Sequence, residues 1–215
     1  MSTSEAPRTI AHEFRPRDLI GGDVAVDLVN TVNSRDEDPE DWLDGFPRLL
    51  EWAELTGSFD AVAIRRLGRL ASRDPAAAAR ALRSIKELRE AVHGVLTAIG
   101  SGAVPRGDDV RRVERSWKQA VTAGRIDVTA GETRVRLDVE TSRLAYVEHE
   151  IALHALDLFE SLPRERTRIC EGPRCGWLFI DRSKGGRRRW CDMQTCGNAA
   201  KSRRHYRRHR VAGLA

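Results

Sequence analysis

The stretch from Cys170 to Cys196, CEGPRCGWLFIDRSKGGRRRWCDMQTC, contains every cysteine of a chain of 215 residues. The cysteines form two pairs with the same C-x4-C spacing, separated by 15 residues. Thiolates separated by about two to four residues can face a single ion, and zinc accepts four such ligands tetrahedrally at about 2.3 Å each. The spacing therefore predicts one structural zinc ion, and the predicted ligands are Cys170, Cys175, Cys191 and Cys196.

Other uses of four cysteines stay open from the spacing alone. Two disulfides, a redox-sensing cluster, an iron–sulfur cluster or four unrelated buried thiols would also account for them, and His205 and His209 are further candidate ligands. The first residues, MSTSEAPRTIAHEF, lack an apolar signal core, and the chain has no run of 18 apolar residues. We therefore expect no membrane span and a cytoplasmic protein, in which disulfides are disfavoured. Because four protein ligands leave no position for water, we expect a scaffolding metal rather than zinc catalysis. No catalytic residue is expected, since residues 20–162 contain no Gly-rich phosphate loop, no exposed-nucleophile signature and no HExxH pair.

The residues between and after the cysteine pairs predict a small finger. GWLFID and RRRW have the character of two strands joined by the turn-like RSKGG, and GNAAKSRRHYRRHR is a helix candidate. A cysteine at the start of that helix lies at the positive end of the helix dipole, which favours a thiolate. A knuckle, a hairpin and a helix that carries the last ligand are the layout of a treble-clef finger.

Charge is distributed unevenly along the chain. Residues 164–210 contain 15 lysines and arginines against four acidic residues, whereas the rest of the chain contains 22 against 28. A basic segment attached to an acidic body is typical of a protein that meets a polyanion. In a helix after Cys196, five cations fall within an arc of about 160°. The residues expected to contact DNA are Arg187, Arg188, Arg189, Lys201, Arg203, Arg204, Arg207 and Arg208. A solvated basic face and RNA binding are the alternatives.

Residues 20–162 predict a helical body. Apolar spacing favours a helix from about Val24 to Asn33 and another over FPRLLEWAELTG that stops at Gly57. Asp60 and Asp74 are expected to cap two further helices, the second of which is long and stops at Gly100. The segment DDVRRVERSWKQAVTAG repeats the helical pattern.

The period changes after that segment. RIDVTAGETRVRLDV alternates apolar and polar residues around a glycine, which predicts a hairpin with Val135, Leu137 and Val139 on one face. TSRLAYVEHEIALHALDLFESLP then returns to helical spacing, and residues 1–16 are expected to be a loose arm. The predicted class is mainly α with a small β-hairpin (α+β). A helical domain over residues 14–162 would precede a treble-clef-like finger over residues 164–210.

The sequence resembles a known pair of domains. The segment from Cys170 to Arg210 is similar to the CGNR zinc finger in both cysteine pairs, in R-W-C and in A-K-x-R-R-H. GGDVAVDLVNTVNSR and DGFPRLLEWAELTG resemble the ABATE domain that precedes such fingers in bacterial proteins, so the likeness covers roughly residues 14–210. It implies a stress-linked transcriptional regulator with the same four cysteines as zinc ligands, a DNA-binding finger and an N-terminal domain that senses a signal. Gly197 and Asn198 match the family signature, but Ala199 stands where the signature has arginine.

Polar side chains in or beside the first apolar helix are candidates for a ligand pocket in the helical domain. They are Asp27, Asn30, Thr31, Asn33 and Arg35. Local hydrogen bonds to the backbone are the alternative for Asn30 and Thr31. The tryptophans Trp42, Trp52 and Trp117 are expected in the core.

The function expected from these observations is a zinc-containing, DNA-binding transcriptional regulator in the cytoplasm, associated with the nucleoid, and not an enzyme. A small-molecule effector is a candidate partner. We expect a homodimer, because a single DNA-binding module buries only about 600–1,000 Å². The alternatives are a ligand-binding enzyme with a purely structural finger and a protein-interaction adaptor.

Overall fold

The computed structural model describes residues 7–35, 37–129, 131–162 and 164–203. Its helices are α1 (Val24–Val29), α2 (Phe46–Thr56), α3 (Ala61–Arg73), α4 (Pro75–Ser101), α5 (Gly107–Ala123), α6 (Val139–Ser142) and α7 (Tyr146–Ser161). Its strands are β1 (Arg8–Thr9), β2 (Val32–Asn33), β3 (Glu40–Asp41), β4 (Arg125–Thr129), β5 (Glu132–Arg136), β6 (Thr167–Ile169) and β7 (Leu178–Ile180). A π-helical turn, Met193–Gly197, leads into a further helix over residues 198–203. The predicted class, mainly α with small β elements, is confirmed.

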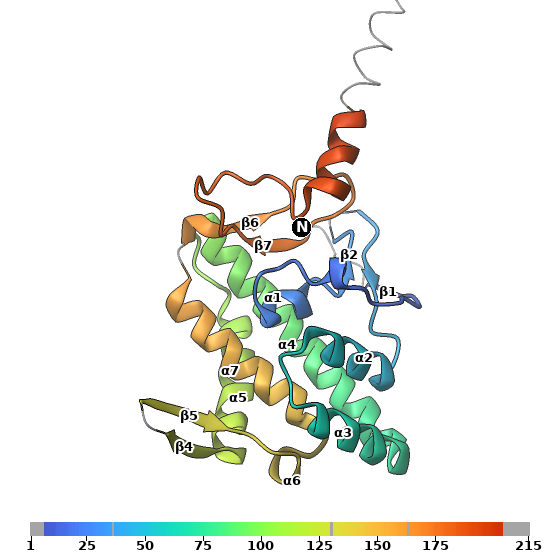
Figure 1. Ribbon diagram of the computed structural model, residues 1–215, viewed down its shortest axis with the longest axis vertical. Helices are drawn as coiled ribbons and strands as arrows, with labels where there is room; N and C mark the ends of the chain where they lie inside the picture. The colour runs from blue at the N-terminus through green and yellow to red at the C-terminus, as the bar shows by residue number, and fades with distance from the viewer. Residues whose placement is uncertain (1–6, 36, 130, 163, 204–215) are drawn as a thin grey trace, which may run out of the picture.

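The long helix α4 organises the molecule. It packs against α5, α7, α1 and the finger strand β6. Figure 1 shows the finger strands β6 and β7 at one end of the helical body and the hairpin β4–β5 at the other. The finger thus packs against one end of α4, the helix that contacts most of the other elements of the body.

Local signals set several helix ends as predicted. The carboxylates of Asp60 and Asp74 accept the N–H groups of Val62 and Ala77, at 2.8 Å each, and so cap α3 and α4. Gly57 ends α2 with a left-handed φ of 65°, a conformation that glycine adopts without steric cost.

The end of α4 differs from the prediction. The helix passes through Gly100 to Ser101 and ends at Gly102, which has a φ of 72°. A Cβ atom at Gly100 would lie 3.3 Å from Cγ2 of Thr167. A side chain at position 100 would thus press tightly against the finger strand β6, which approaches the helix closely there.

The first helix is shorter than predicted, and the N-terminal arm is more ordered. After α1 ends at Val29, the chain turns into β2, which pairs antiparallel with β3, and the backbone of Trp42 donates to the carbonyl of Thr31 (2.9 Å). From residue 7 the arm is not loose, because β1 pairs in parallel with β3. Residues 30–33 have helical spacing, but β2 pairs with β3, which lies within ten residues in the sequence. This pairing overrides the helical pattern.

The finger hairpin also differs from the prediction. Strand β7 pairs with β6, which precedes the first cysteine pair, and Thr167 lies opposite Ile180. The segment RRRW is irregular; its Arg188 N–H donates to the carboxylate of Asp181 (2.8 Å), and the carbonyl of Arg189 accepts from the Glu171 N–H (2.9 Å). A side-chain anchor therefore replaces the expected strand pairing.

The second half of the body contains the predicted hairpin and a divided helix. Ile126 lies opposite Val135 in β4–β5, whereas Leu137 and Val139 lie beyond the strands and are buried in the core. The helix expected from Thr141 onward is interrupted by a short 3-10 turn before α7 begins.

The core of the body includes part of the finger. Leu28, Leu88 and Ile151 are fully buried among the helices, and Leu178 and Ile180 of β7 belong to the same apolar cluster. Burying an aliphatic side chain of this size contributes about 1.5–3 kcal/mol. Finger and body are therefore joined by apolar packing as well as by the chain.

Candidate metal centre and the surface around it

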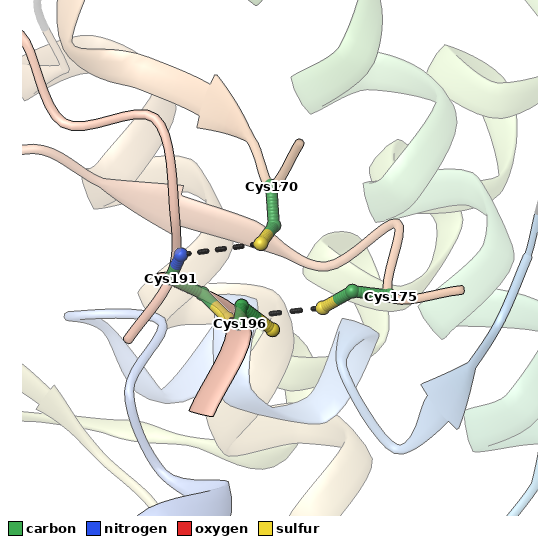
Figure 2. A group of neighbouring side chains, drawn as sticks. All are labelled: Cys170, Cys175, Cys191 and Cys196. Carbon is green, nitrogen blue, oxygen red and sulfur yellow. Dashed lines mark hydrogen bonds between the residues drawn. The ribbon is translucent and has the colours of Figure 1, made fainter. Parts of the chain in front are cut away.

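Four sulfur atoms converge at the junction between finger and body. Cys170 follows β6, Cys175 precedes β7, Cys191 lies in a bend and Cys196 lies in the π-helical turn. Figure 2 shows the four side chains pointing toward one another. All four sulfurs lie within 4.8 Å of each other, and the distances from Cys191 to Cys175 and Cys196 are both 3.7 Å.

This geometry fits zinc. Ligand bonds of about 2.3 Å in a tetrahedron place the sulfurs about 3.8 Å apart, whereas a disulfide requires about 2.05 Å. The N–H groups of Gly172 and Cys191 each lie 3.3 Å from the sulfur of Cys170. Hydrogen bonds from the thiols of Cys175, Cys191 and Cys196 lower the pKa of the Cys170 thiol, which favours the thiolate that binds metal. The donor set is that of one structural zinc ion, and the predicted clustering of the four cysteines is present.

Gly172 makes possible the first zinc knuckle, the turn from Cys170 to Cys175. A Cβ atom at this position would lie 2.7 Å from Cβ and 2.8 Å from Sγ of Cys196. Any side chain here would displace the fourth ligand. The cysteine spacing does not by itself point to Gly172, although a glycine between two cysteines of a knuckle is a signal of close approach.

Two residues that follow α1 hold the finger by its backbone. The Asn30 side chain accepts the N–H of Leu178 (3.0 Å) and donates to the Leu178 carbonyl (2.8 Å). Ser34 donates its N–H to the carbonyl of Cys175 (3.1 Å) and its hydroxyl to the carbonyl of Arg174 (2.8 Å). These four hydrogen bonds fix both the first knuckle and β7 to the body.

Aromatic side chains cover the metal centre. Trp177 packs edge-on against Trp42 (5.5 Å between ring centroids), and His12 of the N-terminal arm stacks on Trp42 (3.7 Å). Both tryptophans belong to the apolar cluster that contains Cys170, Cys175 and Cys191. Trp42 is thus buried as expected, but it lies beside the finger. Trp52 is fully buried in the core of the helical body, and Trp117 packs against the same core.

A buried ion pair supports this aromatic layer. Arg89 of α4 donates two hydrogen bonds to the carboxylate of Asp41 (2.8 and 2.9 Å) and one to Thr31 (3.0 Å). Lys86 also contacts Asp41 (2.9 Å). Burial disfavours the charged form of Asp41, but the hydrogen bonds and charge of Arg89 outweigh it and hold the pKa below its usual value. The pair therefore stays ionised and ties α4 to the residue before Trp42.

The five candidate ligand-pocket residues contact other parts of the protein. Asp27 accepts the N–H of Gly21 (2.8 Å), Thr31 donates to the carbonyl of Leu28 (2.7 Å), and Arg35 pairs with Glu90 (2.6 Å). Asn30 binds the finger as described above, and half-buried Asn33 lies in β2. Local bonding thus holds for Thr31 but not for Asn30, whose partner is 148 residues away. Their role in binding a ligand stays a prediction.

The residues predicted to contact DNA fall into two groups. Arg187, Arg188 and Arg189 are exposed on the finger, and Lys201 and Arg203 are exposed on the helix after Cys196. Arg204, Arg207 and Arg208, like His205 and His209, lie outside the described residues. Ala199, at the position of the signature arginine, is exposed.

Within the described residues, every helix is too short or too polar to cross a lipid bilayer.

The fold and the four-sulfur centre define a class of protein, a helical domain followed by a four-cysteine zinc finger. A family model of the CGNR zinc finger matches residues 166–209. The ABATE family, described as "Putative stress-induced transcription regulator", matches residues 22–161, and the chain belongs to this family. A comparison with curated proteins found no match. The resemblance predicted from the sequence is confirmed for both parts of the chain.

Proposed function

We propose that this protein is a DNA-binding transcriptional regulator that acts by binding and not by catalysis. The zinc finger and the basic segment after it would contact DNA phosphates, and the helical domain would sense a ligand or stress signal. The family description supports a regulator in general terms. The division into a sensor over residues 14–162 and a finger over residues 164–210 is part of this proposal.

One observation carries the proposal. All eight lysines and arginines between Cys170 and Arg203 are exposed, while the three acidic residues of this segment are used internally. Asp181 accepts the N–H groups of Ser183 and Arg188, Asp192 caps the π-helical turn, and Glu171 pairs with Arg189. Little negative charge is left to neutralise the exposed cations, so a polyanion is the natural partner.

The same features support a physical route from signal to DNA. When bound, zinc supplies a rigid link between the first knuckle and the turn that begins the basic helix. Ser34 and Asn30 hold that knuckle and β7 against the body. A change in the body that moves the end of α1 would therefore be transmitted to the finger.

The test is a titration of zinc-loaded protein with a fluorescent DNA duplex at several salt concentrations. The logarithm of the affinity is expected to fall steeply with the logarithm of salt, by about 0.9 for each phosphate contact. Glutamine at Arg203, Arg204, Arg207 and Arg208 should lower both the affinity and this slope. The matched control places glutamine at four exposed arginines of α3 and α4, namely Arg65, Arg69, Arg73 and Arg80.

The outcomes separate the candidate functions. Equal losses in the two quadruple variants would contradict a specific basic surface. Tighter binding of an RNA duplex would favour RNA, and salt-insensitive binding of a protein partner would favour an adaptor.

We further propose that the regulator acts as a homodimer, because two fingers double the DNA contacts. Light scattering at micromolar concentration should give twice the mass of the chain. A monomer that retains sharp binding to one DNA sequence would contradict this.

A further inference from the structure

A cavity of about 460 Å³ lies between the C-terminal end of α4 and the finger. Cavities of about 300–1,000 Å³ accommodate small molecules. Leu96, Thr97 and Ser101 line it from α4, and residues 167–169 with Leu178 line it from the two finger strands. Arg187, Arg188 and Arg189 complete the wall. We propose that this cavity binds a small organic carboxylate with an apolar body.

The charge of the wall favours an anion. It contains four arginines and one acidic residue, Glu171, which is already paired with Arg189 (2.5 Å). Arg168 donates to the carbonyl of Gly186 (2.9 Å), and Arg188 lies 4.8 Å from the ring centre of Phe179. These contacts hold the guanidinium groups in place, while the described residues offer no hydrogen-bond partner to exposed Arg187.

The remaining wall favours an organic ligand. Leu96 and Leu178 are buried, and Ile169, which is 47 % exposed, adds apolar surface. The hydroxyl of Thr167 and Nε of Arg168 are buried without a hydrogen-bond partner among the described residues. An apolar body with a single carboxylate matches such a lining, because the guanidinium fork fits a carboxylate through two hydrogen bonds.

The position of the cavity gives the ligand a regulatory effect. Three of the four arginines of the wall are also residues proposed to contact DNA, so carboxylate and DNA compete for Arg187–Arg189. This competition rests on the proposed DNA binding, whereas binding of the carboxylate does not.

The first experiment measures the ligand alone. Zinc-loaded full-length protein is titrated calorimetrically with benzoate, with the neutral isostere benzamide and with inorganic phosphate at constant ionic strength. Benzoate should bind with one site per chain and at least tenfold more tightly than the other two. Absence of benzoate binding, or equal binding of benzamide or phosphate, would overturn the proposal.

Two variants localise the site. Ile169→Glu places a negative charge in the wall and should weaken benzoate binding at least tenfold, whereas Val110→Glu, at a comparably exposed valine of α5, should leave it unchanged. Since Ile169 adjoins a zinc ligand, zinc content is measured in parallel, and Arg187→Gln provides a second test away from the cysteines. Unchanged affinity in Arg187→Gln would overturn the assignment.

The second experiment separates this proposal from the proposed function. At ten times its own Kd, benzoate should raise the apparent Kd for duplex DNA about elevenfold, and benzamide should not. Benzoate binding without any DNA binding would contradict the proposed function and leave the carboxylate site standing. DNA binding that saturating benzoate does not alter would overturn the competition.

Discussion

The hydroxyl of Ser34 donates a hydrogen bond to the carbonyl of Arg174, and both residues have the same left-handed φ of 54°. Neither is glycine, and this conformation is unfavourable for residues with a side chain. Two unfavourable backbone conformations thus face each other where the body meets the zinc knuckle. The hydrogen bonds of Ser34 to this knuckle offset that cost.

Variants of Ser34 should separate the hydrogen bond from the backbone conformation. Ser34→Ala removes the hydroxyl and keeps the strained φ, and should lower the free energy of unfolding by about 1–3 kcal/mol. Ser34→Gly also removes the hydroxyl but relieves the backbone, so it should be more stable than Ser34→Ala by about 1 kcal/mol. Both should release zinc faster to a chromogenic chelator. Ser72→Ala, at an exposed hydroxyl bonded within α3, is the control, and equal release rates in all variants would contradict this role.

Asn30 should stabilise the finger as well as the helical body. Asn30→Ala leaves the buried N–H and carbonyl of Leu178 without the partners that Asn30 supplies, at a cost of about 2–4 kcal/mol. Thermal unfolding monitored by tryptophan fluorescence, together with chelator-induced zinc loss, would measure both effects. Asn33→Ala, in the neighbouring strand, should have a smaller effect on each. Destabilisation without faster zinc loss would show that Asn30 does not stabilise the finger.

The two glycines Gly172 and Gly185 provide a matched pair. Gly172→Ala would bring a methyl group to within 2.8 Å of the Cys196 sulfur, so the purified protein should contain much less than one zinc per chain. Gly185→Ala should retain full zinc, because a Cβ atom there meets nothing within 4 Å. Metal analysis of both proteins checks this, and stoichiometric zinc in Gly172→Ala would contradict the close packing of the knuckle.

Asp27 should make stability depend on pH. Burial raises the pKa of its carboxyl group from 3.8 to about 7, despite the hydrogen bond from Gly21. Because the folded pKa is the higher one, folding favours the protonated acid. This stabilisation is complete below the unfolded pKa of about 3.8 and is lost as pH rises through about 7.

Between about pH 5 and pH 8, the native sequence should therefore lose about 2 kcal/mol of unfolding free energy relative to Asp27→Asn. Denaturant unfolding of both proteins at each pH measures the difference. Asp157→Asn, at an exposed carboxylate of α7, is the matched control. The idea fails if Asp27→Asn and the native sequence have parallel pH profiles.

Features with a local signal could be predicted from the sequence. The equal spacing of the two cysteine pairs predicts the cluster, and aspartates followed by apolar periodicity predict the starts of α3 and α4. The excess of basic over acidic residues in residues 164–210 predicts the exposed arginines of the finger. Each of these depends on residues near one another in the chain or on chemistry particular to one residue type.

Features that depend on distant partners could not be predicted. Asn30 and Leu178 are 148 residues apart, and Ser34 and Arg174 are 140 apart, with no pattern to connect them. Strand β6 is only three residues long, too short to show alternation, so the sequence predicts RRRW rather than β6 as the partner of β7. Helical spacing after Val29 was likewise overridden by tertiary pairing.

The apolar pair Leu178 and Ile180 has a consequence for how the protein matures. Both side chains complete the core of helices that are synthesised long before them. The helices of a nascent chain therefore lack part of their core until residues 178–180 have been synthesised and packed against them. A chain that ended before β7 would leave this apolar end of the helical body uncovered and exposed to solvent.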